Sequence, residues 1–291
     1  MKKLIAIVMS AILALGVFAG CTPADDGPGE NKYNLTTVKE GYLTVLTSPD
    51  YAPYEFYALD EDGNPTLAGF DMALAQYIAD YLGLTLEVVP MDFKGIPDEM
   101  GNGKGDIALA GLSPDPDRLL KMDFSDIYYD GKQAFVTVKS KKAQFTDLAS
   151  TNDSKFQIAA QTGTIQEDLA KEFSPNAQYT ALTKATDIIA ELVSGKIDGA
   201  YIEWDVAVAY QANYPDLEIL CEVPYEAEGN VIGVSKGNAD LLKYVNEALN
   251  KCVDDGEFAK FVAKALEQAA GDKFEGILDP DGNVPTDPAG E

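Results

Sequence analysis

The chain has 291 residues, of which 46% are hydrophobic and 24% charged, so it can form one or two ordinary globular domains. It carries 48 acidic and 22 basic residues, a formal net charge of −26, and no histidine. Nucleic acid is excluded as a partner, because phosphate binding requires basic surfaces. Without histidine, Ser-His-Asp and Cys-His catalysis and histidine-ligated zinc sites are also excluded. The three cysteines have no close spacing, and we therefore expect no metal site and no cofactor.

Residues 1–20 have the pattern of a signal peptide. Two lysines precede an apolar run of about 15 residues that ends at Phe18, and small residues stand just before Cys21. The run is short for a membrane span, which needs about 20 residues. Positions 18–21 resemble a bacterial lipobox, with Phe18 where leucine is usual, and this resemblance implies that Cys21 is lipidated. Proline, glycine and acidic residues predict a flexible tether at 21–33 and a loosely ordered tail at 271–291.

Between these ends, stretches with strand periodicity alternate with stretches of helix periodicity. Leu43 and Val45 alternate with polar residues as in a strand, and 69–82 has one apolar helical face that ends at Gly83. The alternation continues with strands expected at 84–88, 107–110, 156–160, 198–202 and 217–221, and with helices at 165–173, 188–193, 241–249 and 258–266. Such alternation is typical of α/β layers with largely parallel sheets. Open α/β sheets bind ligands beyond the carboxyl ends of their strands, so the loops there are candidate sites.

The loops of the first half carry aromatic and polar residues. Ser48, Tyr51 and Tyr54 follow the first strand, and Phe93 follows the strand at 84–88. Aromatic side chains at strand ends can form the walls of a small-molecule site. They can equally pack into the core, and the pattern alone does not decide between the two.

The loop after 107–110 contains Gly111, Leu112, Ser113 and Arg118. A glycine lets a ligand approach the backbone, and a serine before a helix start supplies donors for an anion. The guanidinium of Arg118 can bind a carboxylate through two charge-assisted hydrogen bonds. The alternative interpretation is a capped helix with a surface arginine.

The loops of the second half of the chain carry further candidate ligand-binding residues. Thr164 and Ile165 begin a helix whose free N–H groups suit a carboxylate, although Thr164 can also be an ordinary N-cap. Glu203 follows the strand at 198–202 and can pair with an ammonium group, or it is simply an acid at a helix start. Taken together, the loops offer anion donors, one arginine, aromatic walls and a carboxylate, a set that complements a zwitterion.

From position 44 to about 266 the chain resembles the family 3 extracellular solute-binding proteins, which are amino-acid receptors of ATP-driven importers. Ala73, Asp115 and Glu203 stand where the family usually has an acid, threonine and aspartate. The similar stretches occur in the family's order at 51–56, 69–75, 91–95, 103–106, 111–118, 124–129, 163–164, 195–203 and 236–238.

This resemblance implies a two-lobe periplasmic-binding-protein-like α/β fold of type II, with the ligand in a cleft that closes by a hinge. Lobe 1 would comprise 34–134 plus 229–270, and lobe 2 would comprise 135–228, with two crossing strands between them. Arg118 would hold the ligand carboxylate, and Glu203 its ammonium group. The protein would be a lipid-anchored monomer on the extracytoplasmic side of the cell membrane. It would deliver a small amino acid to an importer permease and would not be an enzyme.

Two alternatives stay open. The same family includes secreted cyclohexadienyl dehydratases, in which an acid near position 203 is the general acid, and Glu203 is compatible with that role. The chain could also be a sensory module without transport. Ser48 stands where an acid often recognises basic side chains, which argues against strict basic selectivity. We expect Cys221 and Cys252 to be free thiols in different lobes.

Overall fold

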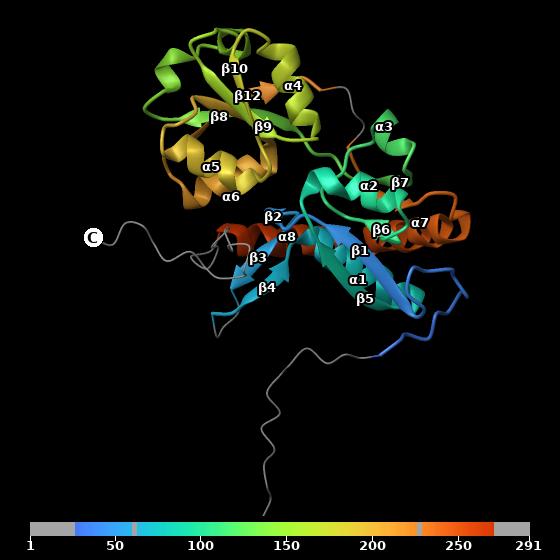
Figure 1. Cartoon of the computed structure of the whole chain (residues 1–291). Helices are drawn as coiled ribbons and strands as arrows, with labels where there is room; N and C mark the ends of the chain where they lie inside the picture. Colours follow the sequence, from blue (N-terminus) through green and yellow to red (C-terminus); the bar gives the residue numbers. More distant parts are fainter. Residues whose placement is uncertain (1–26, 60–62, 226–228, 271–291) are drawn as a thin grey trace, which may run out of the picture.

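The computed structural model describes residues 27–59, 63–225 and 229–270. Two five-stranded sheets, each packed between helices, form two lobes that lie one above the other in Figure 1. The predicted α/β fold with two lobes is confirmed. Within the described ranges, no helix has the length and apolar character needed to cross a membrane.

The sheet of lobe 1 has the strand order β5-β1-β6-β13-β7. Strands β5, β1 and β6 are parallel, whereas β13 runs antiparallel to both of its neighbours. A small antiparallel sheet in the order β2-β3-β4 stands beside it. The strands are β1 (Tyr42–Thr47), β2 (Asp50–Tyr51), β3 (Glu55–Leu59), β4 (Pro65–Ala68), β5 (Thr85–Pro90), β6 (Ile107–Ala108), β7 (Met122–Tyr129) and β13 (Asn230–Ser235).

Helix α1 illustrates how the helices of lobe 1 form. Its apolar residues recur every three or four positions and are buried: Phe70, Leu74, Ile78 and Leu82. It ends at Gly83, whose left-handed backbone, with φ of 71°, favours a residue without Cβ. The helices of this lobe are α1 (Phe70–Leu82), η1 (Phe93–Gly95), α2 (Ile96–Gly101), α3 (Pro116–Leu119), α7 (Ala239–Asp254) and α8 (Glu257–Ala270).

Lobe 2 is built from one continuous stretch of chain. Its sheet has the order β10-β9-β11-β8-β12, in which β10, β9 and β11 are parallel and β8 is antiparallel to both neighbours. The strands are β8 (Gln133–Val138), β9 (Gln157–Gln161), β10 (Gln178–Leu182), β11 (Gly199–Glu203) and β12 (Leu217–Val223). The helices are η2 (Lys142–Gln144), η3 (Leu148–Thr151), α4 (Ile165–Phe173), α5 (Ala185–Val193) and α6 (Trp204–Asn213).

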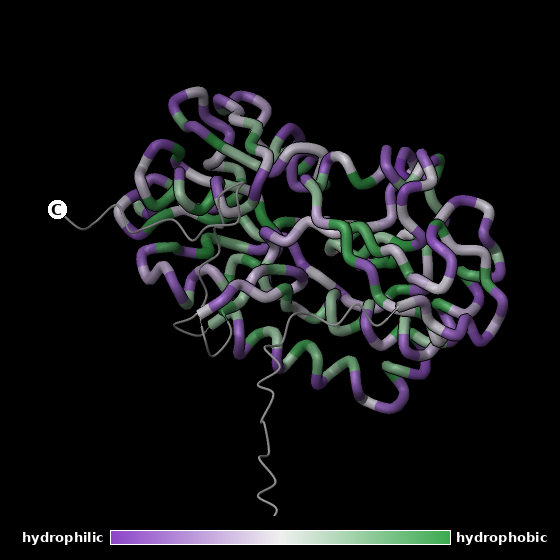
Figure 2. The backbone as a smooth tube through the Cα atoms, turned by 60° about the horizontal axis from the view of Figure 1, so that its bottom comes forward, coloured by the Kyte–Doolittle hydropathy of each residue, from purple (hydrophilic) through white to green (hydrophobic). Residues whose placement is uncertain are grey.

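The chain passes between the two lobes after β7 and again after β12. Helix α8 also contacts both lobes, because it packs on α1 and on α6, and Asn213 donates a hydrogen bond of 2.8 Å to the carbonyl of Ala269. Hydrophobic segments lie inside each lobe and hydrophilic ones at its outer turns (Figure 2). The division at 134/135 and 228/229 stays a prediction, and the sheet strands of lobe 2 extend from Gln133 to Val223.

Part of the predicted tether lies against lobe 1. Gly29 donates to the carbonyl of Gly41 at 2.8 Å and Lys32 to that of Leu82 at 3.0 Å. The ring of Tyr33 stacks on that of Tyr244, with centroids 4.0 Å apart. Backbone pairing and stacking therefore hold residues 27–33, despite a composition typical of a linker. The predicted signal peptide, Cys21 and the tail at 271–291 lie outside the described residues.

The two described cysteines behave as expected. Cys221 lies in β12 of lobe 2 and Cys252 in α7 of lobe 1, and both are free thiols.

Candidate functional site

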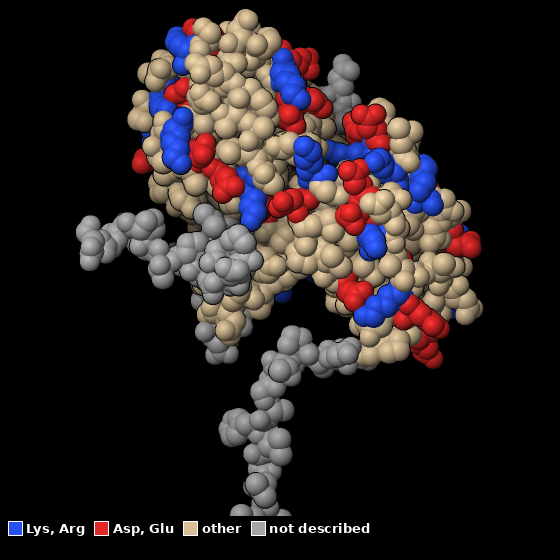
Figure 3. Space-filling model, in the orientation of Figure 1, with Lys and Arg blue, Asp and Glu red and all other residues tan. Residues whose placement is uncertain are grey.

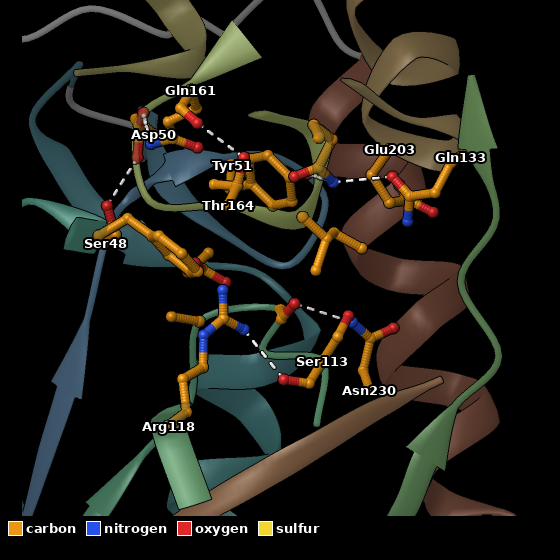
Figure 4. A pocket seen from close by; sticks show the side chains of 16 residues that line it. Ser48, Asp50, Tyr51, Ser113, Arg118, Gln133, Gln161, Thr164, Glu203 and Asn230 are labelled. Atoms are coloured by element: carbon orange, nitrogen blue, oxygen red, sulfur yellow. Dashed lines mark hydrogen bonds between the residues drawn. The ribbon is translucent and has the colours of Figure 1, made fainter. Parts of the chain in front are cut away.

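A cavity lies between the lobes, beyond the carboxyl ends of β1, β6, β9 and β11. The space between its walls, including the part that opens to solvent, amounts to about 390 Å³. Both lobes contribute side chains that point into it (Figure 4). The lining residues are Ser48, Asp50, Tyr51, Glu55, Phe93, Ala110, Gly111, Ser113, Arg118, Gln133, Gln161, Thr164, Ile165, Gln166, Glu203 and Asn230.

All of the predicted ligand-binding residues except Tyr54 and Leu112 line this cavity. Tyr54 is fully buried behind the wall, and its ring centroid lies 5.6 Å from that of Tyr51 and 4.4 Å from that of Phe70. Leu112 belongs to the core cluster that includes Phe93. Both side chains therefore lie behind the wall, where the hydroxyl of Tyr54 donates to the lining residue Asn230 at 3.3 Å, and their contact with a ligand stays a prediction.

Arg118 is a buried residue of the cavity and not a surface arginine. Its guanidinium donates to the carbonyls of Ser113 at 2.9 Å and Gly163 at 3.1 Å, the second across the cleft in lobe 2. It also stands over the ring of Phe93, 5.2 Å from the centroid. Asp115 caps the short helix α3 and so holds the backbone from which Arg118 extends. Burial lowers the pKa of Arg118, which nevertheless stays a cation.

The first turn of α4 presents donors from the opposite lobe. Thr164 is its N-cap, and the hydroxyl accepts the N–H of Glu167, so the ordinary capping role is real. Ile165 and Gln166 are the first two helical residues, and their N–H groups have no partner within the helix. The amide of Gln166 also donates to the hydroxyl of Tyr51 at 3.2 Å, across the cleft. This helix end can therefore take part in binding an anion held by Arg118.

Glu203 lies opposite Arg118, at the end of β11 and the N-cap of α6 (Figure 4). One carboxyl oxygen accepts the N–H of Val206 at 2.9 Å. The other is buried, and the hydroxyl of Tyr54 is the side chain of the described residues that can donate to this carboxyl group. Burial raises the pKa of Glu203 to about 8, and the nearby Asp205 adds to the rise, whereas the Val206 N–H opposes it. A cation in the cavity would give this buried carboxyl group an opposite charge, which its present partners do not provide.

Glu55 is a second acid of the cavity, and it was not among the ligand-binding residues predicted from the sequence. It is fully buried, and within the described part of the chain its carboxyl group receives no N–H or hydroxyl hydrogen bond; its partner is the carboxyl group of Asp71, to which protonated Glu55 donates. Burial raises its pKa well above the usual range, and the carboxyl of Asp71 contributes. Asp71 itself accepts the N–H of Gly111 at 2.9 Å and the hydroxyl of Tyr128 at 3.0 Å. The available signal was an acid inside an apolar run, Tyr54 to Phe56.

Other lining residues were not predicted because single amide or acid side chains form no motif. Asn230 shows the consequence: its amide donates to the carbonyl of Gly111 at 2.8 Å and so fixes the loop before Ser113. The remaining residues of this kind are Asp50, Gln133, Gln161 and Gln166, and the apolar Ala110 also lines the cavity without having been predicted.

A groove of about 780 Å³ adjoins the cavity, with which it shares Arg118, Thr164 and Ile165. Charged side chains of both signs gather where the two lobes meet (Figure 3). Acids predominate in the groove itself, which is lined by Asp98, Asp115, Asp117, Glu167 and Asp168 against Lys121 and Arg118. Across the residues with described positions, no cluster of histidine, cysteine and acidic side chains is suited to a metal ion.

Comparison with known proteins identifies a family with this chain's sequence pattern. Residues 43–268 match the model of the bacterial extracellular solute-binding proteins, family 3. The arginine-binding extracellular protein ArtP of Bacillus subtilis (strain 168) is 30% identical over 91% of this chain and 98% of its own. The cyclohexadienyl dehydratase of Pseudomonas aeruginosa is 29% identical over 55% of this chain and 59% of its own.

A solved structure shares the same fold. It is an amino acid ABC transporter substrate-binding protein from Streptococcus pneumoniae bound to L-arginine, with 36% identity and a TM-score of 0.73. The match covers 78% of this chain and 94% of that one. The chain therefore belongs to the family 3 extracellular solute-binding proteins, as its resemblance implied, and it has their two-lobe fold. It acts on the extracytoplasmic side, as this extracellular family does.

Proposed function

We propose that the protein captures an amino acid with a cationic side chain, such as arginine, for an ATP-driven importer. Glu55 carries this proposal. An amino-acid zwitterion pairs its carboxylate with Arg118 and its ammonium group with Glu203, which leaves the acid Glu55 facing the same cavity. Without a cation, burial and the neighbouring Asp71 raise the pKa of Glu55 well above its usual range, so Glu55 stays protonated and hydrogen-bonds only to that acid. A guanidinium or a second ammonium group offers Glu55 an opposite charge, which favours its ionisation and forms a buried charge pair.

The relatives and the charge distribution support the same class of ligand. ArtP is named for arginine, and the Streptococcus pneumoniae protein is bound to it. The acidic groove beside the cavity favours the approach of a cation. Ser48 carries no charge, which argued against basic selectivity, but Glu55 supplies the acid from the neighbouring strand β3.

The test is calorimetric titration with L-arginine, L-lysine, L-glutamine and L-citrulline, an uncharged near-isostere of arginine. We expect arginine to bind at least about thirtyfold more tightly than citrulline, the effect of about 2 kcal/mol from one buried charge pair. Glu55→Gln should remove that preference. Glu172→Gln, the same change on an exposed residue of α4, should preserve it. Equal affinity of the parent for arginine and citrulline would refute cationic selectivity.

Membrane attachment and transport complete the proposal. Cys21, after its lipobox-like segment, would carry the lipid anchor, and a permease would receive the ligand from the closed lobes. Cys21→Ala should move the protein from the detergent phase to the aqueous phase in detergent partitioning. Equal partitioning of the variant and the parent contradicts the anchor.

Glu203 favours one alternative, a dehydratase. A carboxyl with a pKa of about 8 is protonated at neutral pH and can act as a general acid in a cavity shielded from water. Dehydratase activity on a cyclohexadienyl substrate that disappears in Glu203→Gln would establish this function. Binding of arginine without turnover supports the receptor instead.

A further inference from the structure

Asp50 joins the two lobes through several hydrogen bonds. It belongs to β2 of lobe 1, and its carboxylate accepts the backbone N–H of Ala185 at 2.6 Å and the amide of Gln161 at 3.3 Å. Its backbone carbonyl accepts the hydroxyl of Tyr210 at 3.2 Å. These three donors come from α5, β9 and α6, which all belong to lobe 2. Ser48 donates to the same carboxylate at 2.9 Å and orients it from within lobe 1.

The bond to Ala185 has the character of a helix N-cap supplied by the other lobe. Ala185 is the first residue of α5, and the residue in the N-cap position, Lys184, makes no side-chain capping bond. The first N–H groups of a helix need an outside acceptor, and a carboxylate there also interacts favourably with the helix dipole. Asp50 provides that acceptor across the cleft, and this pairing exists only while the lobes are together.

We propose that Asp50 is the closure residue of this receptor: it caps α5 of the opposite lobe and thereby sets the balance between open and closed forms. It acts on the ligand indirectly, although it lies at the edge of the cavity. Its carboxylate already accepts hydrogen bonds from Ser48, Gln161 and Ala185, which hold it against lobe 2. The inference rests on the proposed function only in so far as the protein closes on a ligand.

A change in the fraction of closed molecules should alter the affinities for all ligands in the same way. The apparent Kd is the intrinsic Kd divided by the fraction of molecules in the binding-competent form. Losing the cap lowers that fraction for every ligand alike, so affinities fall by one common factor and their ratios stay constant. An acid that touches the ligand side chain behaves differently, because its loss weakens cationic ligands more than neutral ones.

The affinity test compares Asp50→Ala and Asp50→Asn with the parent, using L-arginine, L-lysine and L-glutamine. We expect Asp50→Ala to bind each about tenfold more weakly, in line with the loss of an N-cap. Asparagine accepts an N–H about as well as aspartate at an N-cap, so Asp50→Asn should recover most of the affinity. Tyr210→Phe, which removes the hydroxyl bond, should give a smaller but equally uniform loss. A loss confined to arginine and lysine, and equally large in Asp50→Asn, overturns the proposal.

A second measurement needs no ligand and so separates this proposal from the proposed function. Fluorophores on the exposed residues Glu172 of lobe 2 and Lys104 of lobe 1 report the distance between the lobes by energy transfer. In the ligand-free protein, Asp50→Ala should shift the distribution toward the open form, and Asp50→Asn should resemble the parent. Identical distributions in the parent and Asp50→Ala refute the closure role. If no amino acid binds but this shift is seen, the proposed function fails and the closure role stands.

Discussion

Glu203→Gln separates the charge of Glu203 from its shape. Glutamine keeps the size of the side chain, and its oxygen can still accept the N–H of Val206. What it loses is the ability to become a carboxylate when an ammonium group arrives. In the ligand-free parent the pKa of Glu203 is about 8, so at pH 7 most molecules carry the proton. Binding an ammonium group therefore ionises Glu203 and releases that proton.

The size of the effect follows from two opposing contributions. Removing one partner of a buried charge pair costs about 2–5 kcal/mol. Ionising Glu203 at pH 7, one unit below its pKa, already consumes about 1.4 kcal/mol in the parent. The net loss in Glu203→Gln is the difference between the two contributions, which corresponds to about threefold to 400-fold in Kd. This is a large share of the roughly 8 kcal/mol that micromolar binding represents.

Calorimetry at pH 6, 7, 8 and 9 with the tightest ligand provides the assay. Only the carboxylate binds the ammonium group, so the parent should gain up to about tenfold in affinity per pH unit below 8 and level off above it. Glu203→Gln should lack this part of the slope. Glu55 contributes to both proteins, so the difference between the two slopes reports Glu203. If the variant keeps the affinity and the slope of the parent, Glu203 is not the ammonium partner.

Three further outcomes are expected. Arg118→Ala should weaken binding by at least about a hundredfold in calorimetry, because it leaves a buried carboxylate unpaired, and a loss below tenfold would place the ligand elsewhere. Tyr51→Ala should weaken binding less and change the order of preferred amino acids, whereas an unchanged order would show that its ring does not contact the side chain. The ligand-free protein should melt at lower temperature as the pH rises from about 4.5 to 8. Folding raises the pKa values of Glu203 and Asp71, to about 8 and about 6, so the folded state binds the protons more tightly and loses that stability as they dissociate. Glu203→Gln should reduce this fall in calorimetric melting temperature, and an equal fall in both proteins contradicts the assignment.

The sequence predicted most of the site because of a rule of α/β architecture. Parallel strands end at one edge of a sheet, so Ser48 could be grouped with Ser113 in lobe 1 and Thr164 with Glu203 in lobe 2. The cleft that joins the two pairs was implied by the family resemblance. The same rule does not say which face of a turn a side chain occupies. Tyr51 and Tyr54 stand three residues apart in one turn, yet only Tyr51 lines the cavity. That difference comes from packing against α1 and β7, which the local pattern does not encode.

The acids show a second limit. Glu55 and Asp71 are two among 48 acids, and apart from the apolar neighbours of Glu55 it is their burial in the folded protein that distinguishes them. Asp50 finds its partner 135 positions later, in the other lobe. The spacing of apolar residues indicates which face of a single helix or strand is buried. It carries no information on contacts between distant elements, and so neither the buried acids nor the hydrogen bond across the cleft was predicted.

Lobe 1 is built from two separate segments of the chain, and this affects the order in which the two lobes can fold. All strands of lobe 2 lie between Gln133 and Val223, and these two residues pair with each other in the sheet. Lobe 2 can therefore fold before the C-terminal part of the chain has been synthesised or exported. Lobe 1 begins first but finishes last, because β13 lies between β6 and β7 and comes from residues 230–235. Until that strand arrives, β6 and β7 present open edges that favour pairing with other chains. Chains that stop before β13 should accordingly contain a folded lobe 2 and an aggregation-prone lobe 1.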